Sequence, residues 1–184
     1  MLEFRFHGRG GQGAVTSAEL LAVSAVADNK FAQAFPSFGP ERRGAPLQAF
    51  ARISDTKIRN RSKVYEPNVV LVLDYSLISM VNVLEGIKED GLLVVSSNKS
   101  IEEVRKDTKW DGKLAVVDGI GIAMKHIKRP INNTVMLGAL IKASNCVSLE
   151  TMKKAVEHRF GKIAAVNNAA LMEAYETAQI SEAK

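Results

Sequence analysis

A short stretch near the amino terminus has the residue types and spacing of an anion-binding turn. It consists of Gly8, Arg9, Gly10, Gly11, Gln12 and Gly13. An apolar-rich run at residues 2–7 predicts a strand before it, and an Ala/Leu-rich run at residues 14–27 predicts a helix after it. Glycine reaches positive φ without strain and lets a ligand approach the backbone. Since a helix start adds unpaired N–H groups and a positive dipole end, the stretch predicts a site for an anion, most simply a phosphate.

The spacing G-x-G-x-x-G is shared with dinucleotide-binding folds, yet one feature of those folds is missing. They place an acidic residue at the end of the second strand, where it holds the ribose hydroxyls. Here the second predicted strand, residues 31–35, is followed by Pro36, and Asp28 comes before it. The residues leave three interpretations open: a phosphate-binding loop, a stand-alone NAD- or flavin-binding oxidoreductase domain, and a tight turn without a ligand.

The start of the following helix depends on the same choice. The pattern Thr16-Ser17-Ala18-Glu19 is typical of a capping box, which would begin the helix at about Ser17. A phosphate-gripping loop of the dinucleotide type would instead begin the helix near Gly11. The sequence alone does not choose between these two starts.

A second candidate binding element is the loop at residues 36–46, which carries two adjacent arginines. Three prolines and two glycines in these eleven residues exclude a helix or a central strand. Arg42 and Arg43 could bind a carboxylate or a phosphate through their planar guanidinium groups, or one of them could simply pair with Glu41. We favour a binding or docking role, because Phe35 and Phe38 would be exposed there unless a partner covered them.

Positive charge is concentrated in one part of the chain. The formal net charge is +5, and residues 42–63 hold seven basic residues and one acid, so the rest of the chain sums to −1. A phosphorylated cofactor and an acidic partner protein explain this segment equally well. Nucleic acid is disfavoured as a partner, because no DNA- or RNA-reading motif accompanies the charge and aromatic residues make up only 6% of the chain.

The residues that usually perform catalysis are missing as a set. Cys146 is the only cysteine and the three histidines lie far apart, which predicts no metal site and no iron–sulfur cluster on this chain. There is no nucleophile elbow, no paired-carboxylate signature and no P-loop, so we expect no catalytic residue here. Asp74 and Asp118 follow predicted strands, but helix capping is their favoured role. A cofactor-like loop without catalytic residues suggests a subunit of a larger enzyme.

Strands that alternate with helices predict an α/β fold. Further strands are expected at residues 47–53, 69–74, 91–96 and 114–117, and helices at residues 77–87, 131–143, 148–160 and 164–179, with a short helix opened by a capping box at residues 100–103. We expect a three-layer α/β/α, Rossmann-like architecture with a mixed, mostly parallel sheet and a helical C-terminal third. The segment around Ile58 is expected to pair with its neighbour as a hairpin or edge, and residues 181–184 to form a frayed tail.

Length and hydropathy indicate a soluble protein. The 184 residues fit a single domain spanning residues 1–184. No apolar run approaches the roughly 20 residues that cross a bilayer, and the amino terminus lacks a signal pattern. We therefore expect a cytoplasmic protein without a membrane partner.

Five segments together resemble one enzyme family. They are residues 8–16, 35–46, 59–62, 133–139 and 167–168. The sequence is similar, nearly end to end, to the gamma subunit of the 2-oxoacid:ferredoxin oxidoreductases. The first two segments are long and specific motifs, not generic spacing patterns. The form Glu41-Arg42-Arg43-Gly44 resembles the pyruvate and branched-chain members, which favours pyruvate as the substrate and leaves 2-ketoisovalerate as the alternative.

The resemblance implies an oxidoreductase complex and not a self-sufficient enzyme. The family decarboxylates a 2-oxoacid with coenzyme A, giving acyl-CoA, carbon dioxide and reduced ferredoxin. Thiamine diphosphate, Mg and [4Fe–4S] clusters are expected on the alpha, beta and delta subunits, and none on this chain alone. The gamma chain is expected to pack against its partner subunits, to be inactive in isolation, and to contribute to the coenzyme A path.

The resemblance and the loop chemistry together assign candidate cofactor contacts. These are Gly8, Gly10, Gly11, Gln12, Gly13, Arg42 and Arg43. The assignment depends on the glycine loop and on the local positive charge, and coenzyme A is the expected ligand.

Overall fold

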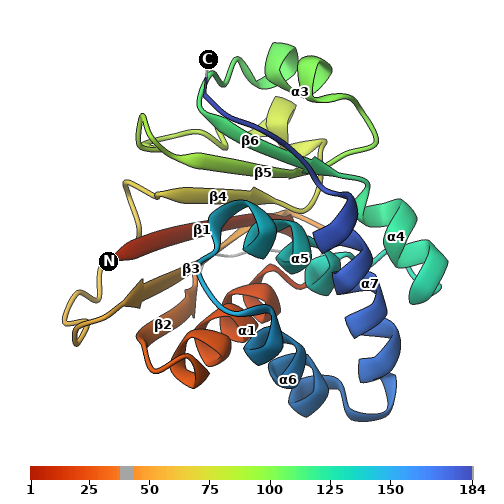
Figure 1. Cartoon of the computed structure of the whole chain (residues 1–184). Coiled ribbons are helices and arrows are strands. Elements are labelled where there is room, and N and C mark those ends of the chain that lie inside the picture. The colour runs from red at the N-terminus through yellow and green to blue at the C-terminus, as the bar shows by residue number, and fades with distance from the viewer. Residues whose placement is uncertain (38–43, 184) are drawn as a thin grey trace.

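A seven-stranded sheet forms the centre of the molecule (Figure 1). The computed structural model describes residues 1–37 and 44–183. The strands, in the order in which they lie in the sheet, are β2 (Phe31–Pro36), β3 (Pro46–Ser54), β1 (Leu2–Arg9), β4 (Val69–Val72), β5 (Leu92–Ser96), β6 (Lys113–Val117) and β7 (Gln179–Ser181). The helices are α1 (Ala14–Ala27), α2 (Leu77–Met80), α3 (Ile101–Thr108), α4 (Gly119–His126), α5 (Asn133–Ser144), α6 (Leu149–Phe160), the 3₁₀ turn η1 (Gly161–Ile163) and α7 (Ala164–Thr177).

The sheet is mixed and mostly parallel, as the sequence predicts. β1, β4, β5 and β6 pair in parallel. β3 is antiparallel to both β1 and β2, and β7 is antiparallel to β6. Five of the seven strands therefore point in the same direction, with β3 and β7 opposed to them. The expected α/β class is confirmed.

Side chains alternate between the two faces of this sheet, and the faces are covered differently. On β1, Phe4 and Phe6 enter the larger apolar core, while Arg5 and His7 point to the other face. The larger core lies under α1, α4, α5, α6 and α7 (Figure 1). A smaller core, built on Val70, Val72 and their neighbours, is covered by α2 and α3. The three expected layers are present, and one of them is thin.

The helix expected at residues 77–87 is mostly wrong. Only Leu77–Met80 is helical, and the chain then turns away through Gly86 at φ 65°. The buried Arg5 donates hydrogen bonds to the carbonyl oxygens of Val83 (3.0 Å) and Glu85 (2.6 Å). These two contacts turn the carbonyls of a non-helical segment towards the buried guanidinium.

The hairpin or edge expected around Ile58 is also wrong. Residues 55–68 contain no strand. A fully buried Arg52 donates to the carbonyl oxygens of Ser62 (2.9 Å) and Lys63 (3.1 Å), and Gln33 donates to that of Ile58 (3.4 Å). Side chains thus replace the backbone ladder that a strand would need.

The C-terminal third is helical, as expected, but its end is not simply a frayed tail. After α7 the chain forms β7, which pairs with β6 through Leu114↔Ser181. Arg105 of α3 donates hydrogen bonds to Ser181 Oγ (3.0 Å) and to the carbonyl of Glu182 (2.6 Å). This buried arginine fixes the segment that the sequence leaves unpaired.

Candidate functional site

The glycine loop lies where open α/β sheets usually bind ligands. The chain leaves the carboxyl end of β1, crosses through α1 to β2 and β3 on one side, and later builds β4, β5 and β6 on the other. The carboxyl ends of β1 and β4 therefore meet at the topological switch point of the sheet. The loop spans residues 8–13 and occupies this junction.

The backbone of the loop explains its glycines. Gly11 and Gly13 have φ of 98° and 85°, values that other residues rarely adopt. A Cβ added to Gly13 would lie 2.6 Å from Asn133 Nδ2, so a side chain has no room there. Helix α1 begins at Ala14 with Gly13 as its N-cap. The observed start lies three residues after Gly11 and three residues before Ser17, so it matches neither of the two alternatives.

The start of α1 has anion-binding character. No side chain of the described residues caps it by a hydrogen bond, so its first-turn N–H groups face the loop without a side-chain acceptor. The helix is 14 residues long, and its dipole adds positive potential at this end. The residues therefore fit a negatively charged group at this position.

A polar network holds the loop against β4. Gln12 Oε1 accepts a hydrogen bond from the Arg9 backbone N–H (2.7 Å), and Gln12 Nε2 donates to Asp74 Oδ2 (2.9 Å). Arg9 Nε forms an ion pair with the same Asp74 oxygen at 2.8 Å. The Gln12 side chain thus shapes the loop from within and joins the ends of β1 and the strand beside it.

Asp74 stays ionised because the hydrogen bonds that it accepts lower its pKa more than its partial burial raises it. Partial burial favours the neutral form, but hydrogen bonds from Ser76, Gln12 and Arg9 lower the pKa of Asp74 below its usual range. Ser76 donates both its N–H (3.0 Å) and its hydroxyl (2.6 Å) to Asp74 Oδ1. Asp74 is therefore an anchor for the loop and not the expected helix cap, because the N-cap of α2 is Ser76.

Both signature segments of the sequence meet at this loop. Gly10 N–H donates to the carbonyl of Ala45 (3.0 Å), and Gly44 N–H donates to the carbonyl of Gly10 (3.2 Å). Arg9 Nη1 also donates to the Gly44 carbonyl at 3.1 Å. Arg42 and Arg43 lie outside the described residues, as does Phe38. The arginine pair directly precedes Gly44 in the chain.

Gly8 has a packing role at the end of β1. It is buried, and a Cβ there would lie 3.2 Å from Leu73 Cδ1 and 3.3 Å from Ala14 Cβ. The close approach of β1, β4 and α1 therefore favours glycine at this position.

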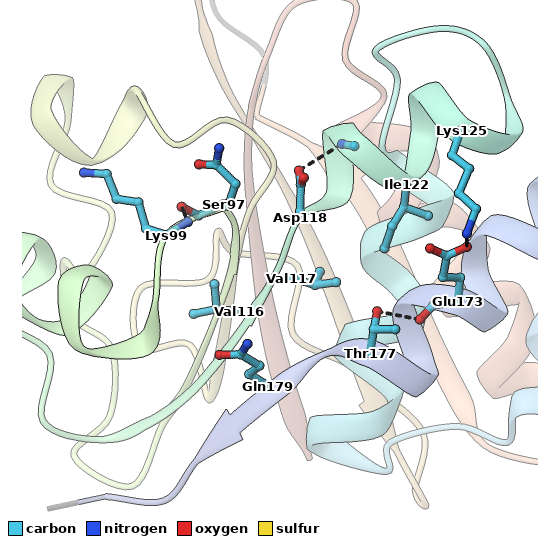
Figure 2. A pocket seen from close by; sticks show the side chains of 12 residues that line it. Ser97, Lys99, Val116, Val117, Asp118, Ile122, Lys125, Glu173, Thr177 and Gln179 are labelled. Atoms are coloured by element: carbon cyan, nitrogen blue, oxygen red, sulfur yellow. Dashed lines mark hydrogen bonds and ion pairs between the residues drawn. The ribbon is translucent and has the colours of Figure 1, made fainter.

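A groove continues from the loop along the carboxyl ends of the parallel strands. Its first part has a volume of about 530 Å³ and extends from Gln12 and Asp74 past Ser96 to Asp118. Its second part has a volume of about 380 Å³ and shares Asp118 with the first. Figure 2 shows Ser97 and Lys99 on one side of this second part and Lys125 with Glu173 on the other. The groove can hold an extended polar ligand.

Charged groups in the groove are mostly paired. Lys99 Nζ and Tyr75 Oη both contact Asp107 Oδ2, at 2.7 Å and 2.6 Å. Lys125 Nζ lies 2.8 Å from Glu173 Oε2. Asp118 caps α4 by accepting a hydrogen bond from Gly121 N–H (2.9 Å), which confirms its expected capping role.

Helix α5 anchors the same edge. Asn132, 1% exposed, donates to the carbonyl of Leu73 (3.0 Å) and to Ser96 Oγ (2.8 Å). Asn132 is also the N-cap of α5, so the helix expected at residues 131–143 is present and begins at Asn133. One side chain thus ties α5 to the ends of β4 and β5 beside the glycine loop.

Comparison with known families decides the membership of the chain. A family model described as pyruvate ferredoxin/flavodoxin oxidoreductase matches residues 3–177, nearly the whole sequence. The chain belongs to the pyruvate ferredoxin/flavodoxin oxidoreductase family. The resemblance inferred from the two long motifs is therefore confirmed.

Individual members of the pyruvate ferredoxin/flavodoxin oxidoreductase family match over full length. A Thermococcus kodakarensis protein named pyruvate/ketoisovalerate oxidoreductases common subunit gamma is 49% identical over 184 residues, covering 99% of this chain and 100% of the relative. The Thermotoga maritima pyruvate synthase subunit PorC is 46% identical and covers 98% of this chain and 96% of the relative. The crystal structure of the Thermotoga maritima pyruvate oxidoreductase subunit PORC matches with a TM-score of 0.89 at 43% identity, over 98% of both chains. The chain is a gamma-type subunit of this oxidoreductase family.

No group of three or more His, Cys, Asp or Glu side chains that could hold a metal ion occurs in residues 1–37 and 44–183. In the same part of the chain, no helix is long and apolar enough to cross a membrane.

Sequence reasoning missed one contributor to this site. Arg9 lies inside the glycine motif but was not expected to act, although it binds Asp74, Ser76 and Gly44. The sequence signal for this role is a basic residue at the end of one predicted strand, Arg9, together with an acid at the end of another, Asp74. Away from this site, Asn167 and Asn168 of α7 are buried, at 4% and 9% exposed. Asn167 accepts a hydrogen bond from Thr134 Oγ1 (2.8 Å) inside the helical layer.

Proposed function

We propose that this gamma-type chain supports coenzyme A-dependent oxidative decarboxylation of pyruvate within a 2-oxoacid:ferredoxin oxidoreductase complex. The products are acetyl-CoA, carbon dioxide and reduced ferredoxin. The alpha, beta and delta subunits carry thiamine diphosphate, Mg and the [4Fe–4S] clusters, and this chain is inactive alone. The complex is cytoplasmic, and residues 1–184 act in it as one domain.

The glycine loop is the proposed contact for coenzyme A. Gly10, Gly11 and Gly13 allow close approach of an anionic group to the backbone, and the start of α1 adds uncapped N–H groups. Coenzyme A supplies the thiol that takes up the acyl group. Gln12 contributes by holding the loop in shape through Asp74, and Gly8 by letting β1, β4 and α1 approach closely.

One observation carries this proposal: the backbone hydrogen bonds of Gly10 with Gly44 and Ala45. They bring the glycine loop beside Gly44 and Ala45, which directly follow Arg42 and Arg43 in the chain. We propose that these two arginines bind the same phosphate as the loop, because guanidinium groups bind phosphate in a planar, bidentate manner.

Kinetics of the assembled complex test the proposed contacts. Arg42→Ala with Arg43→Ala is expected to raise the KM for coenzyme A by about tenfold or more, because hydrogen bonds to charged groups contribute about 1.5–3 kcal/mol each. The KM for pyruvate should stay the same. The matched control is Lys106→Ala with Lys154→Ala, which removes two exposed charges on α3 and α6. An unchanged KM for coenzyme A in a fully assembled double variant would refute the assignment.

A branched-chain 2-oxoacid is the second candidate substrate. The name of the Thermococcus kodakarensis relative pairs pyruvate with ketoisovalerate. Steady-state rates with both acids on the purified complex decide between them, and a kcat/KM higher for 2-ketoisovalerate would overturn pyruvate.

A stand-alone NAD- or flavin-binding domain is less consistent with the sheet. In dinucleotide-binding units the second strand lies parallel and next to the first, where its terminal acid reaches the ribose. Here the antiparallel β3 separates β1 from β2. Calorimetric binding of NAD(P) or a flavin to the isolated chain with micromolar affinity would support this alternative.

A further inference from the structure

Four basic side chains lie near the amino ends of the strands, whereas the glycine loop lies at their carboxyl ends. Lys57, Arg59, Arg61 and Lys63 are all exposed and lie in the connection between β3 and β4, near the amino ends of β1 and β4. We call residues 57–63 the basic loop. Its net charge is +4, and the net charge of the whole chain is +5. Among the described residues, no carboxylate forms an ion pair with any of these four side chains.

The basic loop is held in place from beneath. Arg52, 0% exposed, ion-pairs with Glu3 at 2.7 Å and donates to the carbonyls of Ser62 and Lys63 at 2.9 and 3.1 Å. Asn60 Oδ1 accepts hydrogen bonds from both the N–H (2.9 Å) and the hydroxyl (2.8 Å) of Ser62. Burial of the Arg52 guanidinium costs desolvation free energy, which the ion pair and the hydrogen bonds to the loop carbonyls offset. The four charges are therefore presented on a positioned loop.

The outermost strand of the sheet lies beside the basic loop. β2 is six residues long and pairs with β3 alone among the described strands, so its outer backbone groups can accept a further strand. A recess of about 340 Å³ lies at this strand, lined by Gln33, Ala34, Phe35 and Arg61. Phe31 at the start of the strand is 48% exposed. This recess, which combines the apolar side chains of Ala34 and Phe35 with Arg61 of the basic loop, thus lies at the outer strand.

We propose that the basic loop and the outer edge of β2 dock an acidic, extended segment of another subunit of the complex. The proposal relies on the proposed function only for the existence of partner subunits. No acidic residue lies among the four basic residues, since Ile58, Asn60 and Ser62 separate them, so an acidic partner segment complements this loop in charge. Backbone pairing along β2 supplies affinity, and the recess accepts one apolar side chain of the partner.

Charge reversal in the assembled complex tests this surface. Arg59→Glu with Arg61→Glu is expected to weaken association of this chain with its partner subunits at least tenfold, since like charges then face the acidic segment. The wild-type association should weaken as salt rises. The matched control, Lys106→Glu with Lys154→Glu, makes the same charge change on exposed helix positions away from the basic loop and should leave assembly unchanged. Circular dichroism of each variant checks that the chain folds.

Two measurements on the wild-type complex examine the contact directly. Carbodiimide coupling, which joins amines to carboxylates, is expected to link Lys57 or Lys63 to an Asp or Glu of one partner subunit. Hydrogen exchange of β2 amides should slow at least tenfold in the complex relative to the isolated full chain. Unchanged assembly of Arg59→Glu with Arg61→Glu, together with no cross-link and no added protection of β2, would overturn the proposal.

Other occupants of the basic loop give different outcomes. A raised KM for coenzyme A with normal assembly would assign the loop to the small ligand and overturn docking. Salt-sensitive binding of RNA or DNA by the complex, abolished by the charge reversal without a change in assembly, would also overturn it. The coenzyme A assignment fails independently, through an unchanged KM in the Arg42→Ala, Arg43→Ala variant.

Discussion

The two faces of the sheet are stabilised by different means. One face lies under α1 and the helices from α4 to α7, and its core combines apolar side chains with buried Ser, Thr and Asn side chains (Figure 1). The other face is covered by two short helices and by loops, and three buried arginines reach into it. Those arginines are Arg5, Arg52 and Arg105. On the first face helices satisfy their own backbone, whereas on the second side chains satisfy the backbone of the loops.

The helical face depends on close apolar contact. Gly138 of α5 lies against the Leu171 carbonyl of α7, so closely that a Cβ would collide with it. Burial of aliphatic side chains stabilises such a face without demanding particular partners. The arginine-anchored face is less tolerant, because each guanidinium left without acceptors is a buried, uncompensated charge. Loss of one anchor should therefore cost as much as loss of a large core side chain and should free a defined loop.

The largest expected effect comes from Arg52→Met. The substitution leaves the carbonyls of Ser62 and Lys63 without their donor and Glu3 without its partner. The free energy of unfolding should fall by about 3–5 kcal/mol, as measured by urea denaturation. Hydrogen exchange in residues 57–64 should accelerate beyond this global loss.

Leu137→Ala on α5 provides the comparison for Arg52→Met. It should destabilise by about 2–5 kcal/mol, because it leaves a cavity in the helical layer. All regions should then exchange in step, with no additional effect at residues 57–64. Selective loosening of that segment by Leu137→Ala would show that the two faces are not independent.

A pH experiment sharpens the comparison at His7. This side chain is 2% exposed on the arginine-anchored face and accepts a hydrogen bond from Arg5 Nε at 3.0 Å. Burial first, and then the positive charge of Arg5, lower the pKa of His7 from its usual 6.5 to about 3. Below pH 6.5 the unfolded chain takes up a proton that the folded chain refuses, so stability falls as the pH falls from 6.5 towards about 3.

His7→Gln should remove this part of the pH dependence while keeping an acceptor for Arg5. Between pH 7 and pH 5 the variant is expected to lose about 2 kcal/mol less stability than the wild type. Urea denaturation at several pH values measures the difference, which isolates His7 because all other titrating groups are shared. Parallel profiles for the two proteins would mean that His7 takes up its proton in the folded state.

Much of the fold follows from the sequence because apolar periodicity determines it. The continuous apolar runs at residues 69–72 and 92–95 predict strands buried on both faces, and both are central in the sheet. Cap residues at Ser100 and Ser148 likewise predict helices that the structure contains. Local chemistry suffices in each of these cases.

The errors fall where a distant side chain decides the backbone. Residues 81–87 look helical, but Arg5, almost 80 residues away in sequence, binds two of their carbonyls. The basic loop shows the same effect through Arg52. Composition does not reveal whether a basic residue is a buried anchor or a surface charge, since that depends on which strand face it occupies.

The candidate site was predictable in part. The glycine motif identifies the loop, because positive φ and close approach demand that residue type. The role of Arg9 and the inward orientation of Gln12 depend on Asp74, which reaches them only once β1 and β4 are adjacent. Spacing along the chain contains no information about that adjacency.

The smallest expected effect tests whether helix ends contribute to the difference between the faces. Ser148 accepts a hydrogen bond from Thr151 N–H (3.1 Å) and caps α6 on the helical face. Ser100 caps α3 on the other face, accepting from Glu103 N–H at 3.3 Å. Ser148→Ala and Ser100→Ala should each cost about 1 kcal/mol, measured by urea denaturation.

If the two cap variants lose equal free energy of unfolding, the helix ends contribute equally on both faces. The difference between the faces then comes from the buried arginines. The capping groups at both positions are exposed, so neither substitution leaves a buried polar atom without a partner. α3 has an additional restraint, because Arg105 within it donates to the carbonyls of Trp110 (2.9 Å) and Gly112 (3.0 Å). A loss well above 2 kcal/mol from Ser100→Ala alone would show that removing the cap of α3 also weakens the hydrogen bonds of Arg105. The arginine-anchored face would then unfold cooperatively.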